Sequence, residues 1–252
     1  MTGRCADTDE LIIPSLRMRT SIDVGANAGA YAQLLARTSD LLVCFEPVPF
    51  MIRLLNMLFR GQSHVHIQAV ALSDTSGTAR LSIPLRKSEA VSALASLKQT
   101  FEDAEIIEVE TLRFDDFRTR NPWADAAPID FIKIDVEGFE VQVLEGMQET
   151  IASMHPVFLI ETEVRHNGES LQVFQRLAEQ GYSTYISRIG GSLEAVSITR
   201  TEDILAMQSL DDLAQESFNY RIGSERRYLN NFWFIHADSH LSEQLKPFIR
   251  NA

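Results

Sequence analysis

The stretch IDVGANAGAY, residues 22–31, decides the fold predicted for this chain. A short apolar strand containing Asp23 runs into two glycines, Gly25 and Gly29, and a helical pattern follows. Glycine at such a turn lets the backbone bend tightly and lets a ligand or a neighbouring element approach without a Cβ in the way. The residues alone leave both uses open: a ligand-binding turn, or close packing of the helix on the strand.

Apolar runs alternate with helical patterns on both sides of this stretch. Strands are expected at residues 20–26, 41–47, 64–72, 129–138, 156–163, 182–187 and 230–237, with a hairpin extension at 77–85. Helices are expected at residues 30–38, 50–58, 143–151 and 171–177. Alternation of this kind predicts a mainly parallel sheet covered by helices on both faces.

Three segments do not fit the alternation: residues 1–19, 84–112 and 200–228. Because the chain shows no internal repeat and no low-complexity linker, we expect one domain over residues 1–252, with an N-terminal extension and two insertions. Long connections in an open α/β sheet tend to cover the carboxyl edge, where ligands bind. Both insertions are therefore expected to cover the active site.

The composition is that of a soluble globular protein with an excess of acid. The 252 residues include 35 acidic and 23 basic side chains, a formal charge of −12. This balance argues against a nucleic-acid partner, which needs a basic surface. No apolar run approaches the roughly 20 residues of a membrane span, and acids stand where a signal peptide would be apolar. We expect a cytoplasmic protein with no membrane partner.

Glu46 points to the class of cofactor. It ends the second expected strand, where a carboxylate accepts hydrogen bonds from the ribose hydroxyls of a nucleoside. The triplet G-x-G-x-x-G is missing, and Asp23 adds a negative charge that is unfavourable beside a pyrophosphate and favourable beside a cation. S-adenosylmethionine carries a sulfonium and an ammonium group and no phosphate. It is therefore favoured over NAD, although an NAD-dependent oxidoreductase stays open as an alternative.

Five motifs together resemble the FkbM family of S-adenosylmethionine-dependent methyltransferases. They occur between residues 20 and 165 in the order IDVGANAGAY, FEPVPFMIRLLNMLF, AVALSDTSGTARL, IDFIKIDVEGFEVQVLEGM and FLIETE. The resemblance implies a Rossmann-like class I methyltransferase fold, an α/β fold with a seven-stranded, mostly parallel sheet whose last strand is antiparallel. It also implies O-methylation of a small-molecule or glycan acceptor, commonly a sugar or a natural product. A binding protein that keeps the fold without catalysis is a second alternative.

The resemblance also implies a set of cofactor-binding positions. The glycine turn would line the methionine end, Glu46 would hold the ribose, and residues 69–74 would border the adenine. The positions assigned to the cofactor are Asp23, Gly25, Asn27, Gly29, Tyr31, Glu46, Pro47, Ala71 and Asp135.

The fourth expected strand ends in three charged residues, Lys133, Asp135 and Glu137, which alternation places on one side. Methyl transfer to a hydroxyl requires a group that accepts the proton, and this strand tip lies at the reaction edge of the fold. An ion pair between Lys133 and Asp135 that only anchors the strand is the alternative. Burial of such a charged cluster without function is costly, which favours a catalytic role.

Two further residues follow the fifth expected strand. Glu161 ends this strand, and His166 lies in the loop beyond it, where an imidazole with a pKa of ~6.5 could act as a base. Asp135 and Glu161, at adjacent strand tips, could also hold a magnesium ion, because hard oxygen ligands suit it. The sequence names neither the acceptor nor the oligomeric state.

Overall fold

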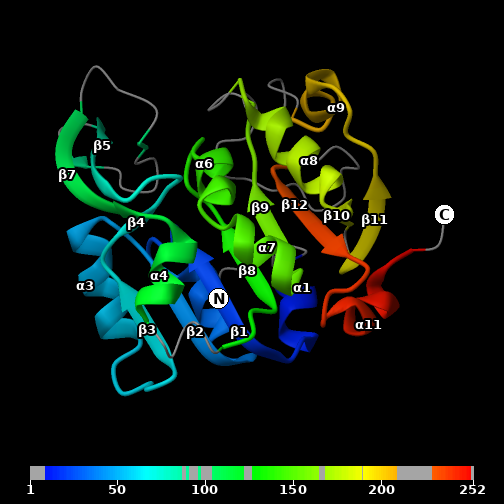
Figure 1. Cartoon of the computed structure of the whole chain (residues 1–252), viewed down its shortest axis with the longest axis horizontal. Coiled ribbons are helices and arrows are strands. Elements are labelled where there is room, and N and C mark those ends of the chain that lie inside the picture. Colours follow the sequence, from blue (N-terminus) through cyan, green and yellow to red (C-terminus); the bar gives the residue numbers. More distant parts are fainter. Residues whose placement is uncertain are drawn as a thin grey trace, which may run out of the picture.

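The computed structural model shows a large sheet with helices on both faces (Figure 1). The structure describes residues 9–86, 89–90, 96–97, 104–121, 127–164, 168–188, 190–208 and 229–250. The main sheet has eight strands in the order β11-β10-β12-β9-β8-β1-β2-β3. Their bounds are β1 Met18–Val24, β2 Ser39–Phe45, β3 Val65–Gln68, β8 Phe131–Ile134, β9 Val157–Glu161, β10 Tyr182–Arg188, β11 Ser192–Val196 and β12 Asn231–His236.

The directions of these strands confirm the predicted fold class. β1 pairs in parallel with both β2 and β8, so Asp23 lies between Cys44 and Lys133 in the register. β12 is antiparallel to both of its neighbours, β9 and β10, as expected for the last strand. The eighth strand, β11, was not predicted. It pairs antiparallel with β10 at the edge of the sheet and is mostly half-buried, so it carries no continuous apolar run.

A second sheet, in the order β4-β7-β5-β6, stands beside the first. Its strands are β4 Ala71–Leu72, β5 Gly77–Arg86, β6 Glu89–Ala90 and β7 Ala104–Leu112. The single strand expected at 64–72 is therefore wrong, because the chain leaves the main sheet after β3 and enters the second sheet at β4. β5 does not extend the third strand of the main sheet, because it pairs along its length with β7.

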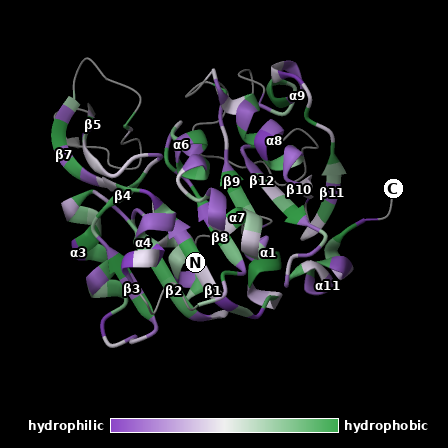
Figure 2. Ribbon diagram, viewed as in Figure 1, coloured by the Kyte–Doolittle hydropathy of each residue, from purple (hydrophilic) through white to green (hydrophobic). Residues whose placement is uncertain are grey.

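Helices cover the two faces of the main sheet in separate sets. On one face, α4 Phe114–Arg120, α6 Glu140–Glu145, α7 Gln148–Met154 and α8 Ser170–Glu179 pack on the strands. On the other face, the strands are covered by α1 Asp9–Ile12, α2 Ala30–Leu35, α3 Pro49–Leu58 and α11 Ser242–Leu245. The remaining helices are α9 Thr201–Leu205 and the 3₁₀ helices Ile13–Ser15 and Lys246–Phe248. Figure 2 shows the apolar colouring concentrated on the central strands.

The single helix predicted at 143–151 is wrong, since the structure has two short helices there, α6 and α7. They break at Gly146, where a Cβ would lie 2.0 Å from the carbonyl oxygen of Ser73. The carbonyl of Gly146 accepts the N–H of Asp115, and the Asp115 carboxylate accepts the N–H of Thr150 in the first turn of α7. Close packing against the second sheet therefore interrupts the helix.

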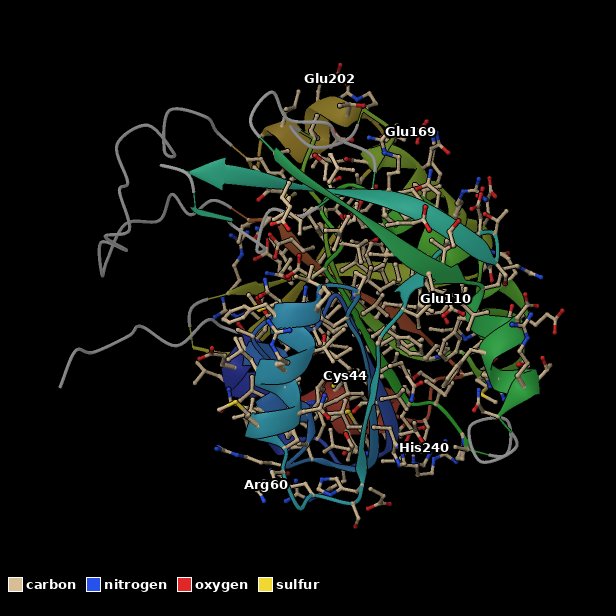
Figure 3. The ribbon with its side chains drawn as sticks, turned by 90° about the vertical axis from the view of Figure 1, so that its left-hand side faces the viewer. Cys44, Arg60, Glu110, Glu169, Glu202 and His240 are labelled. Carbon is tan, nitrogen blue, oxygen red and sulfur yellow. The ribbon has the colours of Figure 1, made fainter. Side chains whose placement is uncertain are left out.

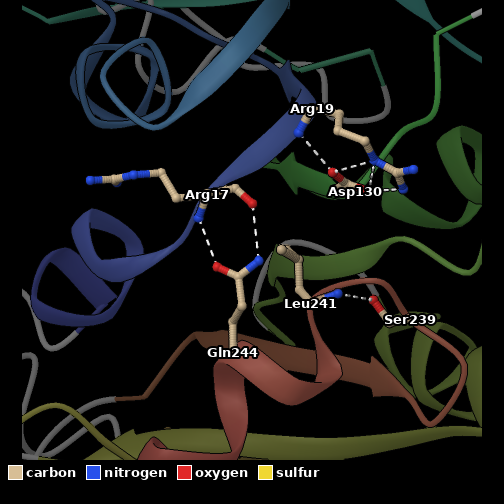
Figure 4. Close-up of polar contacts among 6 residues, drawn as sticks. All are labelled: Arg17, Arg19, Asp130, Ser239, Leu241 and Gln244. Atoms are coloured by element: carbon tan, nitrogen blue, oxygen red, sulfur yellow. Dashed lines mark hydrogen bonds and ion pairs between the residues drawn. The ribbon is translucent and has the colours of Figure 1, made fainter.

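Polar contacts hold the amino edge of the main sheet (Figure 4). The side chain of Asp130 accepts the backbone N–H of Arg19 at 2.7 Å and pairs with its guanidinium. Gln244 of α11 exchanges two hydrogen bonds with the backbone of Arg17 just before β1. Figure 3 shows Cys44 in the interior, Glu169 and Glu202 towards one end, and Arg60 and His240 towards the other. None of the helices that the structure describes is long and apolar enough to cross a bilayer.

Candidate active site

A cavity of about 320 Å³ lies at the carboxyl ends of β1, β2 and β8, which is a common size for a small-ligand site. One part of its wall is apolar and comes from the second sheet and the segments around it. The other part is polar. Its polar residues are Asn27, Glu46, Asp135, Glu137 and Glu161.

Both glycines of the β1–α2 turn have left-handed backbone conformations, with φ of 79° at Gly25 and 83° at Gly29. A Cβ at Gly25 would lie 1.9 Å from the carbonyl oxygen of Asp135, and a Cβ at Gly29 would lie 2.9 Å from Leu58 of α3. The backbone contact requires glycine at position 25, and the left-handed conformation favours glycine at both positions. Gly25 also lines the cavity, whereas Gly29 is buried behind it. The turn serves packing first, and only Gly25 borders the space for a ligand.

The carboxylate of Glu46 is held by two backbone donors. One oxygen accepts the N–H of Asn27 and the other accepts the N–H of Val48, each at 2.8 Å. Asn27 reaches this position in a left-handed conformation, φ 48°, which asparagine adopts more readily than most residues. Burial raises the pKa of Glu46, and the two N–H donors oppose that shift. Each oxygen keeps further acceptor capacity, so the carboxylate can receive two hydroxyls on the cavity side.

The apolar part of the wall begins next to Glu46. Val48, Ala71 and Leu81 belong to one buried cluster formed where the second sheet meets the β2–α3 turn. Val70 and Leu72 line the same part of the cavity, together with Pro47. An apolar slot beside a fixed carboxylate suits an aromatic base joined to a ribose.

The opposite end of the cavity is acidic and follows a bend beyond β8. The strand ends at Ile134, and Glu137 has a left-handed conformation, φ 50°, before Gly138. The carbonyl of Glu137 accepts a hydrogen bond from the Ser96 hydroxyl at 2.9 Å. The Glu140 carboxylate, whose pKa burial raises to about 7, accepts the N–H of Gly138. This bend, and not strand alternation, turns Glu137 towards the cavity.

Lys133 lies fully buried beneath this end and does not line the cavity. Its Nζ is 3.7 Å from Asp135 Oδ2 and donates to the side chain of Asn231 at 3.2 Å. It also lies 4.8 Å from the centre of the Tyr31 ring, which likewise is not on the cavity wall. The ion pair between Lys133 and Asp135, which the sequence offered as the alternative to a catalytic role, is present. The Asp135 carboxylate nevertheless lies on the cavity wall.

Asp23 is also buried behind the wall, with 2% of its surface exposed. Its Oδ2 has no hydrogen-bond partner among the described residues. Burial raises the pKa of Asp23 to about 7, while the charge of Lys133 lowers it. Asp23, which the sequence assigned to the cofactor, is therefore not on the cavity wall.

Glu161 completes the acidic end and is held by an amide that the sequence prediction missed. Asn230 Nδ2 donates to Glu161 at 2.6 Å and to Glu163 at 3.0 Å. Burial raises the pKa of Glu161, and the neighbouring charge of Asp135 raises it further. Asn231 lies opposite Glu161 in the register of β12 and β9. The sequence signal for these amides was the pair Asn230–Asn231 directly before the apolar core of the last strand. Because that strand is antiparallel, it begins at the edge where the parallel strands end.

His166 lies outside the described residues, as do 209–228 of the later insertion and 87–88, 91–95 and 98–103 of the earlier one. Leu97, between these gaps, lines the cavity. Within the described part of the chain, Asp135 and Glu161 do not belong to a group of three or more potential metal ligands.

Comparison with known families gives a match over residues 23–184 to the model described as the methyltransferase FkbM domain. Among solved structures, the chain is similar to a methyltransferase FkbM from Methylobacillus flagellatus KT, with 12% sequence identity and a TM-score of 0.51. That match covers 87% of this chain and 44% of the other, so this chain spans less than half of that structure's length.

A second similar structure is a protein from Streptococcus mutans in complex with SAH. It has 9% identity and a TM-score of 0.42, with 75% of this chain and 92% of the other covered. Comparison with curated proteins gave no match.

Proposed function

We infer that this chain, which belongs to the FkbM methyltransferase family, transfers a methyl group from S-adenosylmethionine to a hydroxyl of a sugar, glycan or natural product. One observation carries the binding part of this proposal: the Glu46 carboxylate is held by two backbone N–H donors beside an apolar slot. The adenine would lie against Val48, Ala71 and Leu81, and both ribose hydroxyls would donate to Glu46. Family membership favours methyl transfer over the hydride transfer of an NAD enzyme.

The acidic end of the cavity supports the choice of a cationic donor. Asp135, Glu137 and Glu161 line this end, and the ammonium group of Lys133 is buried behind it, 3.7 Å from Asp135. A sulfonium near the carboxylates of Asp135 and Glu137 is electrostatically favourable, and low-dielectric surroundings strengthen the attraction. Bound there, S-adenosylmethionine supplies a methyl group on a positively charged sulfur.

Asp135 is the residue we assign as the proton acceptor. The Asp135 carboxylate would accept the hydroxyl proton as the acceptor oxygen takes the methyl group, and the electrons of the broken carbon–sulfur bond would stay on sulfur. The ion pair with Lys133 orients that carboxylate. Glu161, whose pKa is raised by burial, would hold its proton and donate a hydrogen bond to the acceptor. The apolar wall excludes competing water.

The test is transfer of labelled methyl from S-adenosylmethionine to a panel of sugars and polyketides. Substitution D135N removes the proton acceptor and should lower kcat about 10²- to 10⁴-fold. Binding of the product S-adenosylhomocysteine (SAH) should be retained. The matched control is E110Q, an exposed carboxylate on β7 outside the cavity, which should leave kcat unchanged. D135N with wild-type kcat would contradict the assignment, and SAH binding without transfer to any acceptor would favour the non-catalytic alternative.

A chelator tests whether turnover depends on a metal ion. If Asp135 is the proton acceptor, turnover should persist in EDTA. Loss of turnover in EDTA that added magnesium restores would instead assign Asp135 and Glu161 to a metal. Thermal shifts with SAH and with NAD separate the two cofactor classes, because only the ligand that binds the folded state raises Tm.

A further inference from the structure

A chain of polar side chains runs behind the acidic end of the cavity, from Lys133 on β8 to Glu161 on β9. It passes through Asn230 and Asn231, which follow one another at the start of β12. The register of β12 and β9 places Asn231 opposite Glu161, and the carbonyl of Asn230 accepts the N–H of Thr162 at 2.7 Å. Strand pairing therefore fixes the positions from which both amides extend.

The ammonium group of Lys133 determines the orientation of Asn231. An ammonium group has three N–H donors and no acceptor, so a side chain that binds it must present an oxygen. Lys133 Nζ lies 3.7 Å from Asp135 Oδ2. It donates to the carbonyl of Ile134 and to Asn231 Oδ1, each at 3.2 Å. Since its oxygen faces Lys133, Asn231 must turn its NH₂ group the other way.

Asn231 in turn determines the orientation of Asn230. Asn231 Nδ2 donates to Asn230 Oδ1 at 3.5 Å, the longest link of the chain, so the NH₂ group of Asn230 points away from Asn231. That group donates to Glu161 Oε1 at 2.6 Å and to Glu163 Oε1 at 3.0 Å. All the links run in one direction, from an ammonium group to carboxyl oxygens.

The orientation of Asn230 decides which oxygen of Glu161 faces the cavity. Asn230 binds Oε1, which leaves Oε2 for the cavity that Glu161 lines. Burial is the main cause that raises the pKa of Glu161, followed by the charge of Asp135. The other charged groups that face it are Lys133, which lowers this pKa, and Glu163 and Glu137, which raise it. Glu161 therefore keeps a proton near neutral pH, and on Oε2 that proton points into the cavity.

We propose that Asn230 and Asn231 are positioning residues for the acceptor, because their orientation keeps the proton of Glu161 directed into the cavity. The proposal rests on the methyl transfer proposed above, since the molecule that receives this hydrogen bond is the acceptor of that reaction. An amide has nearly the same shape in both orientations, so its partners select one of them. A reversed Asn230 would turn its Oδ1 to Glu161 and accept the proton itself, and the acceptor would lose that hydrogen bond.

The first measurement is the pH titration of Glu161, which does not require turnover. Carbon NMR of the full chain, with glutamate isotope-labelled at Cδ, follows the carboxyl groups, and E161L identifies the signal of Glu161. The test variant N231L replaces the amide by an apolar side chain of similar size. N231T is a second variant, because threonine favours a strand but is too short to join Lys133 to Asn230.

Both variants should shift the titration of Glu161 to higher pH. Without Asn231, the amide of Asn230 is free to reverse, and a hydrogen bond that stabilises the protonated carboxyl raises its pKa. The matched control is N121L. Asn121 is half-buried after α4, outside the cavity, and its Nδ2 donates to the Phe117 carbonyl at 2.8 Å. N121L should leave the titration of Glu161 as in the wild type.

The second measurement is steady-state kinetics with the sugar or polyketide that accepts labelled methyl. N231L and N231T should raise KM for that acceptor roughly 3- to 10-fold, the effect of one hydrogen bond, and should lower kcat less. N121L should leave both constants unchanged. In the E161L background N231L should not raise KM further, because no proton remains to be directed.

The outcomes separate this proposal from the proposed function. An unchanged Glu161 titration in folded N231L and N231T would overturn the role of the two asparagines, and so would an equal shift in N121L. A further rise of KM when N231L is added to E161L would overturn it as well. A shifted titration in a protein whose wild type transfers methyl to no acceptor would support the amide chain and contradict the proposed function.

Discussion

Substitution of Glu46 by glutamine tests the cofactor site with the smallest change of shape. The wild-type carboxylate accepts two backbone N–H groups, from Asn27 and Val48, at 2.8 Å each. An amide has only one oxygen, so its NH₂ group must face one of these two donors. The fixed double acceptor is lost, and with it the acceptor for at least one ribose hydroxyl.

The expected loss of affinity follows from these contacts. A hydrogen bond to a charged group contributes about 1.5–3 kcal/mol, and the remaining hydroxyl bond weakens because its acceptor is neutral. A total of about 2–4 kcal/mol corresponds to a roughly 30- to 1,000-fold higher Kd for SAH. The ligand-free protein should be affected less, because burial of the Glu46 carboxylate already raises its pKa and a neutral amide avoids that cost of burying charge.

Calorimetric titration with SAH measures the Kd, and urea denaturation measures the free energy of unfolding of the same samples. E110Q makes the same chemical change on an exposed face of β7 and should leave both quantities unaltered. A Kd for E46Q within threefold of the wild-type value, with the fold intact, would refute the assignment of Glu46 to the ribose.

Three other substitutions test the surroundings of the site. G25A should lower the free energy of unfolding far more than G61A. Both glycines have a left-handed φ, but only a Cβ at Gly25 would meet a carbonyl oxygen, 1.9 Å away. Comparable losses of about 1–2 kcal/mol for the two variants in urea denaturation would contradict this. Burial raises the pKa of Asp23 to about 7, so the folded state favours its protonated form, and the wild-type free energy of unfolding should fall as the pH rises from about 4 to about 7. D23N should remove up to about 1.4 kcal/mol per pH unit of that fall. Identical pH profiles for the two proteins would contradict this. Gln208 binds the backbone of Thr162 and Val164 beyond β9, so Q208L should raise KM for the acceptor more than it lowers kcat, and unchanged steady-state kinetics would count against this.

The central strands could be predicted because each is an apolar run between turn residues. Strand β11 at the edge of the main sheet and strand β7 of the second sheet could not. β11 is mostly half-buried, and on β7 the glutamates Glu108 and Glu110 are exposed beside buried Val109, so neither strand shows a continuous apolar run. The chain passes from β3 to β4 within one apolar run. The break between them could not be seen because β4 pairs with β7, which is remote in sequence, whereas β3 pairs with β2.

A residue of the cavity wall could be predicted where one charged residue follows directly after an apolar strand, as Glu46 does. It was less predictable where the strand had already ended. Alternation grouped Lys133 with Asp135 and Glu137, but β8 stops at Ile134, so Lys133 points into the core while the two carboxylates line the cavity. The apolar slot was missed in part because it is built across the two sheets.

The central claim is that an S-adenosyl nucleoside binds across the ends of β1 and β2 with its ribose on Glu46. A crystal structure of the full chain with SAH tests it most directly. We expect both ribose hydroxyls within hydrogen-bond distance of the Glu46 oxygens and the adenine in contact with Leu81. A nucleoside bound elsewhere, or a ribose that does not contact Glu46, would contradict the claim.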